Sequence, residues 1–213
     1  MGTAEKKGKL FIISGPSGTG KGTICKALLE RNDIEISISM TTRAPREGEI
    51  HGVSYYFATR EEFEKTIAEG GFLEYADVFG NYYGTPKAMV VEKLEQGRDV
   101  VLEIDVQGAI NAKKVYPESV LIFILPPSLE ELRARIVGRG TETEDVINLR
   151  LSKALEEMSY IDKYDYYVVN DVIDDAIIRT EAIMLAEHGR VNRDDVETML
   201  DKYKEEKNVI SIS

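Results

Sequence analysis

The sequence predicts an α/β fold in which a parallel sheet is flanked by helices. Four short apolar runs are continuous rather than alternating, which is typical of parallel strands buried on both faces: Lys9–Ser14, Asp99–Val106, Ser119–Leu125 and Tyr166–Asn170. Helical patterns separate these runs, as expected for right-handed crossovers between parallel strands. A glycine-rich segment, "SGPSGTGKGT", directly follows the first run and precedes a helical pattern. Strand, loop and helix in this order are the context of a phosphate-binding loop.

The composition is that of a globular protein, with 43% hydrophobic and 31% charged residues among 213. The formal net charge of −11 argues against broad binding to nucleic acid or to anionic membranes, because both partners need a basic surface. No apolar run approaches the roughly 18 residues of a membrane span, and the first residues lack a secretory signal. We therefore expect a cytoplasmic protein with neither kind of partner.

The first helix follows the glycine-rich loop and presents Ile24, Ala27 and Leu28 on one face. The single cysteine, Cys25, lies one turn past the loop, where we expect a small core residue rather than a reactive thiol. The two histidines are far apart in the sequence, which argues against a histidine-rich metal site.

A segment from about Ser37 to Tyr83 interrupts the strand–helix alternation with strand-like pieces around a short helix, which predicts a small mixed β insertion. After it, Thr85 and Pro86 fit the N-cap and first position of a helix that Gly97 closes.

The later helices have their own signals. Ser128 and Glu131 fit a capping box that opens the helix "SLEELRARI". The final core helix is expected at "DDAIIRTEAIMLAEH". Beyond it, the tail "KNVISIS" has alternating apolar residues that fit an edge strand, a subunit contact or no ordered structure.

The glycine-rich loop has the composition that phosphate binding requires. Gly15, Gly18 and Gly20 let backbone N–H groups converge on phosphate oxygens, Lys21 adds a positive charge, and the following helix directs its positive end at the site. Gly22 stands where the common motif has a Ser or Thr that holds Mg²⁺. A glycine-rich turn without a ligand is the alternative, but the full spacing favours a nucleotide.

Motifs along most of the chain, from Lys9 to about His188, resemble the guanylate kinase family. They are "GPSGTGKGT", "SISMTTRAPREGEIHGVSYYF", "FLEYADVFGNYYGTP", "VLEIDVQG", "GRGTETEDVINLRL" and "VVND". The resemblance implies a P-loop NTPase core with a GMP-binding region and a helical lid. It also implies phosphoryl transfer from ATP to GMP in purine nucleotide metabolism, with Mg²⁺ as cofactor, dGMP as a further acceptor and a monomer or homodimer. Gly22 does not contradict it, because the family uses both GKS and GKG loops.

The resemblance divides a single domain of residues 1–213 into four parts. The core covers about 8–36, 98–127 and 164–188, the GMP-binding region about 37–90, the lid about 128–160, and a helical tail about 189–213.

The resemblance also implies the site residues. Those for ATP are Gly15, Pro16, Ser17, Gly18, Thr19, Gly20, Lys21, Gly22, Thr23, Arg139, Asn170 and Asp171. Those for GMP are Ser39, Arg43, Arg46, Tyr55, Glu74, Tyr83, Thr85 and Asp105. The catalytic set is Lys21, Arg43, Arg139 and Arg150, and Glu103 and Asp105 are expected to hold the metal through water.

The chemistry of these residues agrees with their implied roles. Guanidinium groups suit phosphate oxygens, and phenols add neutral donors. A carboxylate at Glu74 accepts the adjacent N1–H and N2–H₂ donors of guanine, whereas adenine has an acceptor at N1. The alternatives are that Arg43 and Arg46 are solvated loop charges while the tyrosines are core aromatic residues, and that Glu74 faces outward from an alternating strand.

Two acidic residues, Glu103 and Asp105, lie two apart in an expected strand, so we expect them to face the same side at its carboxyl end. Related proteins often have Asp at the position of Glu103. In the lid, Arg135 can join the phosphate arginines, whereas the alternative for both Arg133 and Arg135 is a surface charge on a helix; both interpretations stay open for each residue. A nucleoside monophosphate is largely a dianion at neutral pH, so no general base is required.

Two other functions remain open from the sequence. A guanylate-kinase-like scaffold module would bind phosphorylated peptides, but such modules have damaged phosphate loops, and this chain retains Lys21. A kinase for another phosphorylated acceptor, such as a ribose phosphate, would lack the guanine-reading Glu74.

Overall fold

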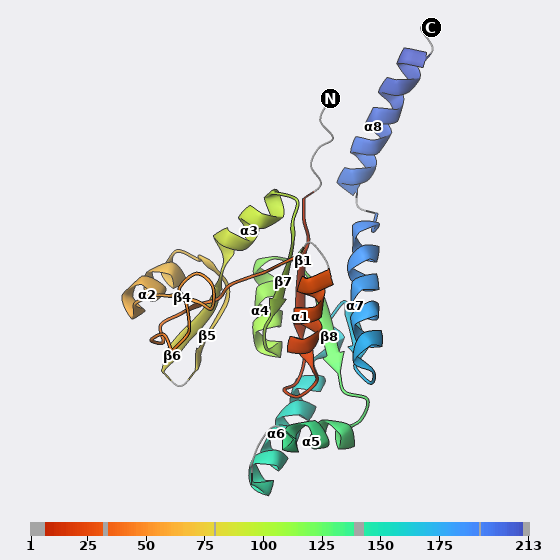
Figure 1. Ribbon diagram of the computed structural model, residues 1–213. Helices are drawn as coiled ribbons and strands as arrows, with labels where there is room; N and C mark the ends of the chain where they lie inside the picture. Colours follow the sequence, from red (N-terminus) through yellow and green to blue (C-terminus); the bar gives the residue numbers. More distant parts are fainter. Residues whose placement is uncertain (1–6, 32–33, 79, 139–142, 192, 211–213) are drawn as a thin grey trace. The chain divides into compact units, whose positions relative to one another are not determined.

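The computed structural model describes residues 7–31, 34–78, 80–138, 143–191 and 193–210 (Figure 1). The chain divides into two compact units whose boundary falls within α7 (Ile173–His188), after Glu181. The second unit contains the end of α7 and α8 (Arg193–Ile210). The sequence "KNVI" is therefore helical, and the edge strand that was one interpretation of the tail is wrong for these four residues.

The core of the first unit is a parallel sheet in the order β2-β7-β1-β8-β9. Its strands are β1 (Leu10–Ser14), β2 (Ile34–Ile36), β7 (Asp99–Glu103), β8 (Val120–Leu125) and β9 (Tyr166–Val169). The predicted α/β fold is confirmed, and all four expected strands are present. The short strand β2 was not predicted, because a three-residue Ile-Glu-Ile segment carries no recognisable apolar run.

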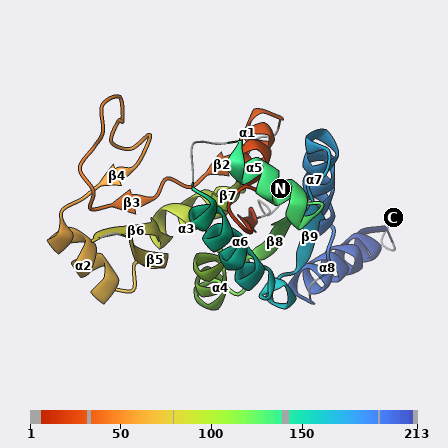
Figure 2. The ribbon, with the colours of Figure 1, turned by 90° about the horizontal axis from the view of Figure 1, so that it is seen from below.

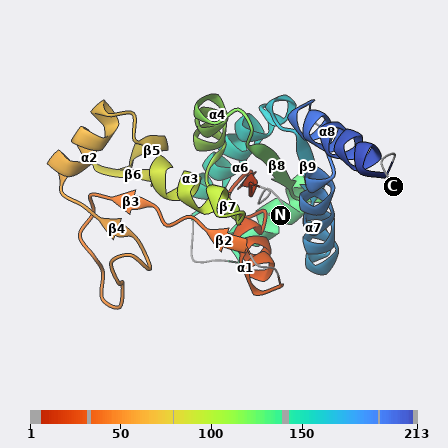
Figure 3. The same ribbon diagram turned by 90° about the horizontal axis from the view of Figure 1, so that it is seen from above.

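Helices cover both faces of this sheet, with α1 (Lys21–Arg31) and α4 (Val106–Val115) on opposite sides (Figures 2 and 3). Leu10 and Ile12 of β1 pack into one core cluster with α4 and with α3 (Lys87–Glu95). Because successive strand residues point to opposite faces, Phe11 and Ile13 are buried on the other side. Burial on both faces explains why the apolar runs do not alternate.

The insertion forms a separate mixed sheet in the order β4-β3-β6-β5, shown with α2 beside the core in Figure 1. Its elements are β3 (Met40–Thr41), β4 (Tyr56–Phe57), α2 (Arg60–Ala68), β5 (Phe72–Val78) and β6 (Asn81–Pro86). Phe63 of α2 joins helix to sheet, because its ring stacks on Phe72 at 4.3 Å and on Tyr82 at 5.1 Å. The predicted mixed β insertion is confirmed.

One expected helix start is wrong. Thr85 and Pro86 are the last residues of β6, and α3 begins at Lys87 with Pro86 as its N-cap and no side-chain cap. Thr85 instead pairs with Glu74 in the β5–β6 ladder. A local N-cap pattern was outweighed by the pairing of Thr85 with the preceding strand, β5, in a hairpin.

Two helices, α5 (Leu129–Val137) and α6 (Glu144–Met158), pack against each other at the edge where β1 and β8 end (Figures 1 and 2). Their contact buries Leu132, Ile136, Ile147 and Ala154. Ser128 caps α5 by accepting a hydrogen bond from the N–H of Glu131. The Glu131 carboxylate pairs with Arg135 rather than with the cap, so only half of the expected capping box is present. A 3₁₀ turn (Ile161–Lys163) then leads into β9.

None of the described helices combines the length and hydropathy of a membrane-crossing segment. The side chain of Cys25 is buried, with 1% of its surface exposed, and burial raises its pKa to about 12. The prediction of a small core residue is confirmed.

Candidate active site

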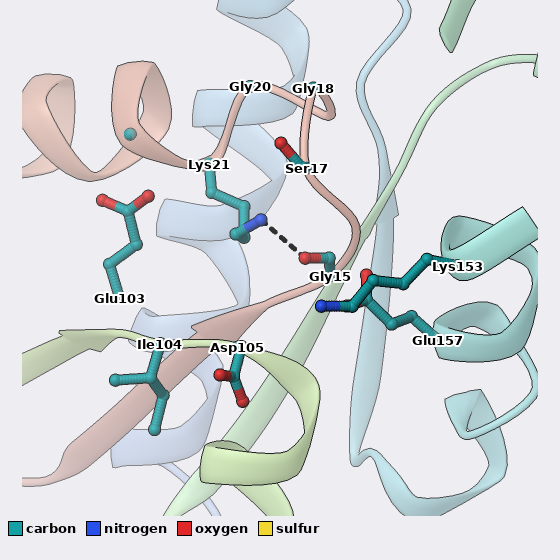
Figure 4. Close-up of a pocket in the computed structure, with 11 residues that line it drawn as sticks. Gly15, Ser17, Gly18, Gly20, Lys21, Glu103, Ile104, Asp105, Lys153 and Glu157 are labelled. Atoms are coloured by element: carbon teal, nitrogen blue, oxygen red, sulfur yellow. Dashed lines mark hydrogen bonds and ion pairs between the residues drawn. The ribbon is translucent and has the colours of Figure 1, made fainter. Parts of the chain in front are cut away.

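A cavity of about 410 Å³ opens at the carboxyl edge of the parallel sheet, where β1 and β7 end side by side (Figure 4). Three parts of the fold line it: the loop between β1 and α1, the segment from β7 to α4, and α6. The lining residues are Gly15, Ser17, Gly18, Gly20, Lys21, Gly22, Glu103, Ile104, Asp105, Lys153 and Glu157. Ligands of open α/β sheets bind at this edge.

The loop encloses the ammonium group of Lys21. Lys21 Nζ donates to the carbonyl oxygen of Gly15 at 2.6 Å (Figure 4). It also donates to the carbonyl oxygen of Pro16 at 2.9 Å. Gly15, Gly18 and Gly20 have φ of 138°, 92° and 91°, which side chains rarely adopt. The chain can therefore curl around the lysine, which is the shape that lets backbone N–H groups converge on a phosphate.

Asn170, the residue that follows β9, supports this loop. Its side chain is only 4% exposed, and its amide Nδ2 donates to the carbonyl oxygen of Thr19 at 2.8 Å. Neighbouring Asp171 is exposed, accepts from the N–H of Val172 and lies 3.9 Å from Arg179. The amide of Asn170 is thus committed to the loop, and Asp171 is the more accessible of the two residues expected beside adenine.

The expectation that Glu103 and Asp105 share one strand is wrong. β7 ends at Glu103, and Asp105 is the N-cap of α4, where its Oδ1 accepts from the N–H of Gly108 at 2.7 Å. A short carboxylate before a helix satisfies otherwise unpaired N–H groups, which explains the early end of the strand. Both residues still border the cavity, because the strand end and the helix start meet at the same edge.

The carboxylates fit a magnesium ion that is held mainly by a nucleotide and water. A methyl group placed on Gly22 would lie 3.4 Å from Oε1 of Glu103, so the carboxylate reaches the position where a hydroxyl side chain would begin. Among the described residues, no group of three or more His, Cys, Asp or Glu could hold a metal by itself. Carboxylate oxygens with few direct contacts are typical of magnesium bound through phosphates and water.

Sequence reasoning missed Lys153 and Glu157, which reach the same cavity from α6 (Figure 4). Their side chains lie 3.9 Å apart, and burial raises the pKa of Glu157 while Lys153 and Lys21 oppose the rise. The helical spacing of the sequence could have indicated them. They follow Arg150 by three and seven residues, which places all three residues near one helix face.

The predicted lid arginines differ in their surroundings. Arg133 contacts both carboxylate oxygens of Glu144, at 2.7 and 2.8 Å, and Arg135 pairs with Glu131 at 2.9 Å. These pairs within α5 and α6 favour the interpretation of surface charges. Arg150 is half-buried on α6, and Arg139 lies outside the described residues.

On the mixed sheet, Arg43 gathers two predicted tyrosines. Arg43 Nε donates to the phenol oxygen of Tyr83 at 3.2 Å, and the guanidinium carbon lies 5.6 Å from the centre of the Tyr55 ring. Since the Tyr83 oxygen accepts this bond, its own O–H remains able to donate to a ligand. Arg46 is exposed in the same loop, and its backbone N–H donates to the carboxylate of Glu49 at 2.7 Å.

The predicted guanine residues also come together. Glu74 Oε1 accepts from the hydroxyl of Thr85 at 2.7 Å. A methyl group on Gly108 would lie 3.3 Å from Oε2 of Glu74 and 3.4 Å from Oδ1 of Asp105, so the two carboxylates flank this glycine. Burial raises the pKa of Glu74, the Thr85 hydrogen bond lowers it, and Asp105 raises it further. Glu74 is half-buried rather than outward-facing.

Ser39 lies just before β3 and is half-buried. Its carbonyl oxygen accepts from the N–H of Tyr56 at 2.9 Å, which fixes the backbone of this segment.

Comparison with known proteins gives a consistent result. The family model described as "Guanylate kinase" matches residues 7–187. The guanylate kinase of Clostridium tetani is 57% identical over 188 residues, which cover 88% of this chain and 90% of that protein. The guanylate kinase of Clostridioides difficile is 54% identical over 202 residues, 94% of this chain and 98% of that protein. A crystal structure of guanylate kinase from Anaplasma phagocytophilum has a TM-score of 0.68 at 36% identity and covers 88% of this chain and 90% of that one.

Proposed function

The chain belongs to the guanylate kinase family, and from this premise we propose how its residues transfer a phosphoryl group from ATP to GMP. It is a nucleotide-binding kinase with ATP and GMP as substrates and ADP and GDP as products. One observation best supports separate binding sites for the donor and the acceptor. A glycine-rich phosphate loop and an Arg43–Tyr83 pair beside Glu74 are built on separate sheets of one unit.

The donor side is the loop from Gly15 to Thr23. Its N–H groups and the positive end of α1 bind the ATP phosphates, and Lys21 neutralises charge that develops on the transferred group. Lys21 is held by Gly15 and Pro16 carbonyls until a phosphate replaces them. Thr23 is exposed at the start of α1, where its hydroxyl donates to a phosphate.

The acceptor phosphate is held by Arg43, Arg46, Tyr55 and Tyr83. The contacts of Arg43 with both tyrosines support this grouping. Two guanidinium groups supply paired donors to a dianion, and the phenols add hydrogen bonds without more charge.

The guanine base is read by Glu74, with Asp105, Thr85 and Ser39 around it. The Thr85 hydroxyl fixes one oxygen of Glu74, and the other oxygen faces Gly108. A carboxylate accepts from both N1–H and N2–H₂ of guanine, whereas adenine would leave it partly unpaired.

Magnesium would enter with ATP, as is general for nucleotide kinases, and would supply positive charge to its phosphate oxygens. Glu103 and Asp105 are the residues of this chain that would hold it, through water. Gly22 removes the usual side-chain hydroxyl, and the nearby Glu103 carboxylate compensates in part.

Phosphoryl transfer requires that the two substrates be aligned, and it requires no general base. The GMP phosphate is already largely a dianion at neutral pH and attacks in line. Lys21, Arg43, Arg139 and Arg150 are the catalytic cations.

We assign residues of about 128–160 to a lid that closes over ATP and excludes water, and about 37–90 to the GMP-binding region. We further propose that the protein acts in the cytoplasm, in purine nucleotide metabolism, and that dGMP is a second acceptor. We propose a monomer or a homodimer as its oligomeric state.

Measurement of ADP release with GMP, dGMP, AMP, CMP and UMP tests this function. We expect turnover with GMP and dGMP, and values of kcat/KM lower by about 10³-fold or more with the other acceptors. Equal turnover with AMP would contradict the assignment of Glu74 to guanine. Absence of turnover with all five would favour a scaffold module or a kinase for a different phosphorylated acceptor.

A further inference from the structure

We propose that Glu49 is a positioning residue for the acceptor, which fixes Arg43 and the backbone of Arg46 in the arrangement that receives the GMP phosphate. This inference rests on the proposed roles of Arg43 and Arg46. It adds a residue to the site that itself carries the same sign of charge as the ligand.

The geometry behind this inference is that both oxygens of the Glu49 carboxylate are used. Oε1 accepts from the NH2 nitrogen of Arg43 at 2.8 Å, and Oε2 accepts from the backbone N–H of Arg46 at 2.7 Å. The Arg43 and Glu49 side chains are only 15% and 21% exposed, so water screens this contact less than it screens a surface ion pair. One carboxylate therefore connects both arginines of the predicted phosphate site.

The local sequence explains why Glu49 folds back. Residues Arg46 to Glu49 form a turn in which the N–H of Glu49 donates to the carbonyl oxygen of Arg46 at 3.1 Å. Gly48 has φ of 83° with no atom within 4 Å of an added methyl group, so the turn needs glycine for its backbone angle and not for space. Arg-Glu-Gly-Glu thus returns the last carboxylate to the start of its own turn.

Glu49 orients Arg43 without exhausting its hydrogen-bond donors. The guanidinium has five N–H groups. In the described residues Nε donates to Tyr83, NH1 to the carbonyl oxygen of Ala44, and NH2 to Glu49. Beyond these three contacts, two N–H groups remain for a phosphate. The rings of Tyr55 and Phe57, at 5.6 and 5.9 Å from the guanidinium carbon, further restrict the plane of the group.

A competing role makes the opposite prediction. If Glu49 mainly repelled the phosphate dianion, its neutralisation would strengthen GMP binding. The hydrogen bonds from Arg43 and then from the Arg46 backbone lower the pKa of Glu49, so the carboxylate is charged under assay conditions. The two roles can thus be separated by the sign of the change in GMP affinity.

The test compares Glu49→Gln with Glu47→Gln. The amide introduced by Glu49→Gln can accept through its one oxygen only, and its NH₂ group would face a second donor, either Arg43 or the Arg46 N–H. We expect KM for GMP to rise about ten-fold or more and kcat to fall, because Arg43 is also a proposed catalytic cation, with KM for ATP within about two-fold of wild type. GMP binding without ATP, measured by calorimetry, should weaken by the same factor. Glu49→Asp keeps both oxygens and should lie between wild type and Glu49→Gln.

Glu47 is the matched control, because it is an exposed carboxylate in the same loop and its replacement removes the same charge. Glu47→Gln should leave all three constants unchanged. An unchanged or lower KM for GMP in Glu49→Gln would overturn the inference, as would a parallel rise in KM for ATP. Arg43→Ala distinguishes failure of the proposed phosphate site from failure of this inference. If both Arg43→Ala and Glu49→Gln leave GMP binding unchanged, the assignment of Arg43 to the phosphate is wrong. If Arg43→Ala weakens GMP binding and Glu49→Gln does not, only the positioning role of Glu49 is wrong.

Discussion

The hydroxyl of Thr85 donates a 2.7 Å hydrogen bond to Oε1 of Glu74, and the two residues face each other in the β5–β6 register. Thr85 is 1% exposed, so this bond lies inside the protein and fixes the carboxylate of its partner. A buried acceptor that is already oriented loses little freedom when a ligand binds. The pair is therefore a rigid element on the mixed sheet, which suits the base-reading role proposed for it.

Replacement of Glu74 by Gln should specifically damage the use of GMP. Gln offers one acceptor oxygen where guanine presents two adjacent donors, and its NH₂ group would oppose one of them. We expect kcat/KM for GMP to fall about 100-fold or more, with KM for ATP within about two-fold, measured by coupled ADP release.

The matched control for this prediction is Glu69→Gln, which removes an exposed carboxylate at the end of α2. It should behave as wild type. If Glu74→Gln also retained the wild-type kcat/KM for GMP, the guanine-reading role of Glu74 would be wrong.

The same substitution should change the pH dependence of stability. Burial raises the pKa of Glu74, so the folded protein binds this proton more tightly than the unfolded chain does. Its favourable contribution is present below the unfolded pKa of about 4.3 and is lost as pH rises through the folded pKa. Relative to wild type, the free energy of unfolding of Glu74→Gln should therefore increase with pH between the unfolded and the folded pKa of Glu74, as measured by urea denaturation without nucleotide.

A difference between Glu74→Gln and wild type that stayed constant, or that fell as pH increased, would show that the pKa of Glu74 is not raised.

The elements that local pattern determines could be predicted from the sequence. Strands such as β1 are buried on both faces and keep continuous apolar runs, and the glycine-rich loop has a fixed spacing. The end of β7 and the start of α3 could not be predicted. Asp105 and Thr85 each fit two local structures, and the choice depends on a helix cap in one case and on pairing with the neighbouring strand β5 in the other.

For the site, family motifs identify residues that the chain brings together, such as Arg43 with Tyr83 and Glu74 with Thr85. Residues whose role depends on side-chain direction were missed. Glu49 looks like one of several acidic loop residues until its turn is seen, and Glu157 looks like a solvated helix residue until α6 is placed beside the cavity.

The packing of Asn170 on the phosphate loop predicts a stability change for Gly20→Ala. The methyl group would lie 2.3 Å from Nδ2 of Asn170, and the backbone would keep φ of 91°. The positive φ alone costs about 1–2 kcal/mol. Displacement of the amide from the Thr19 carbonyl oxygen adds about 1–3 kcal/mol, because a buried hydrogen bond is lost. Gly70→Ala has φ of 65° and no atom within 4 Å, so it should show the first cost only.

A double-mutant cycle isolates the collision. In an Asn170→Ala background the amide is absent, so Gly20→Ala should cost about as much as Gly70→Ala, and the coupling energy should equal the excess seen in wild type. Urea denaturation of the four proteins without nucleotide provides the measurement. Additive effects of Gly20→Ala and Asn170→Ala would mean that Asn170 does not restrain the loop. In that case the loop would require Gly20 for its backbone angle alone, and the contact of Asn170 with the phosphate loop would contribute nothing to the free energy of unfolding.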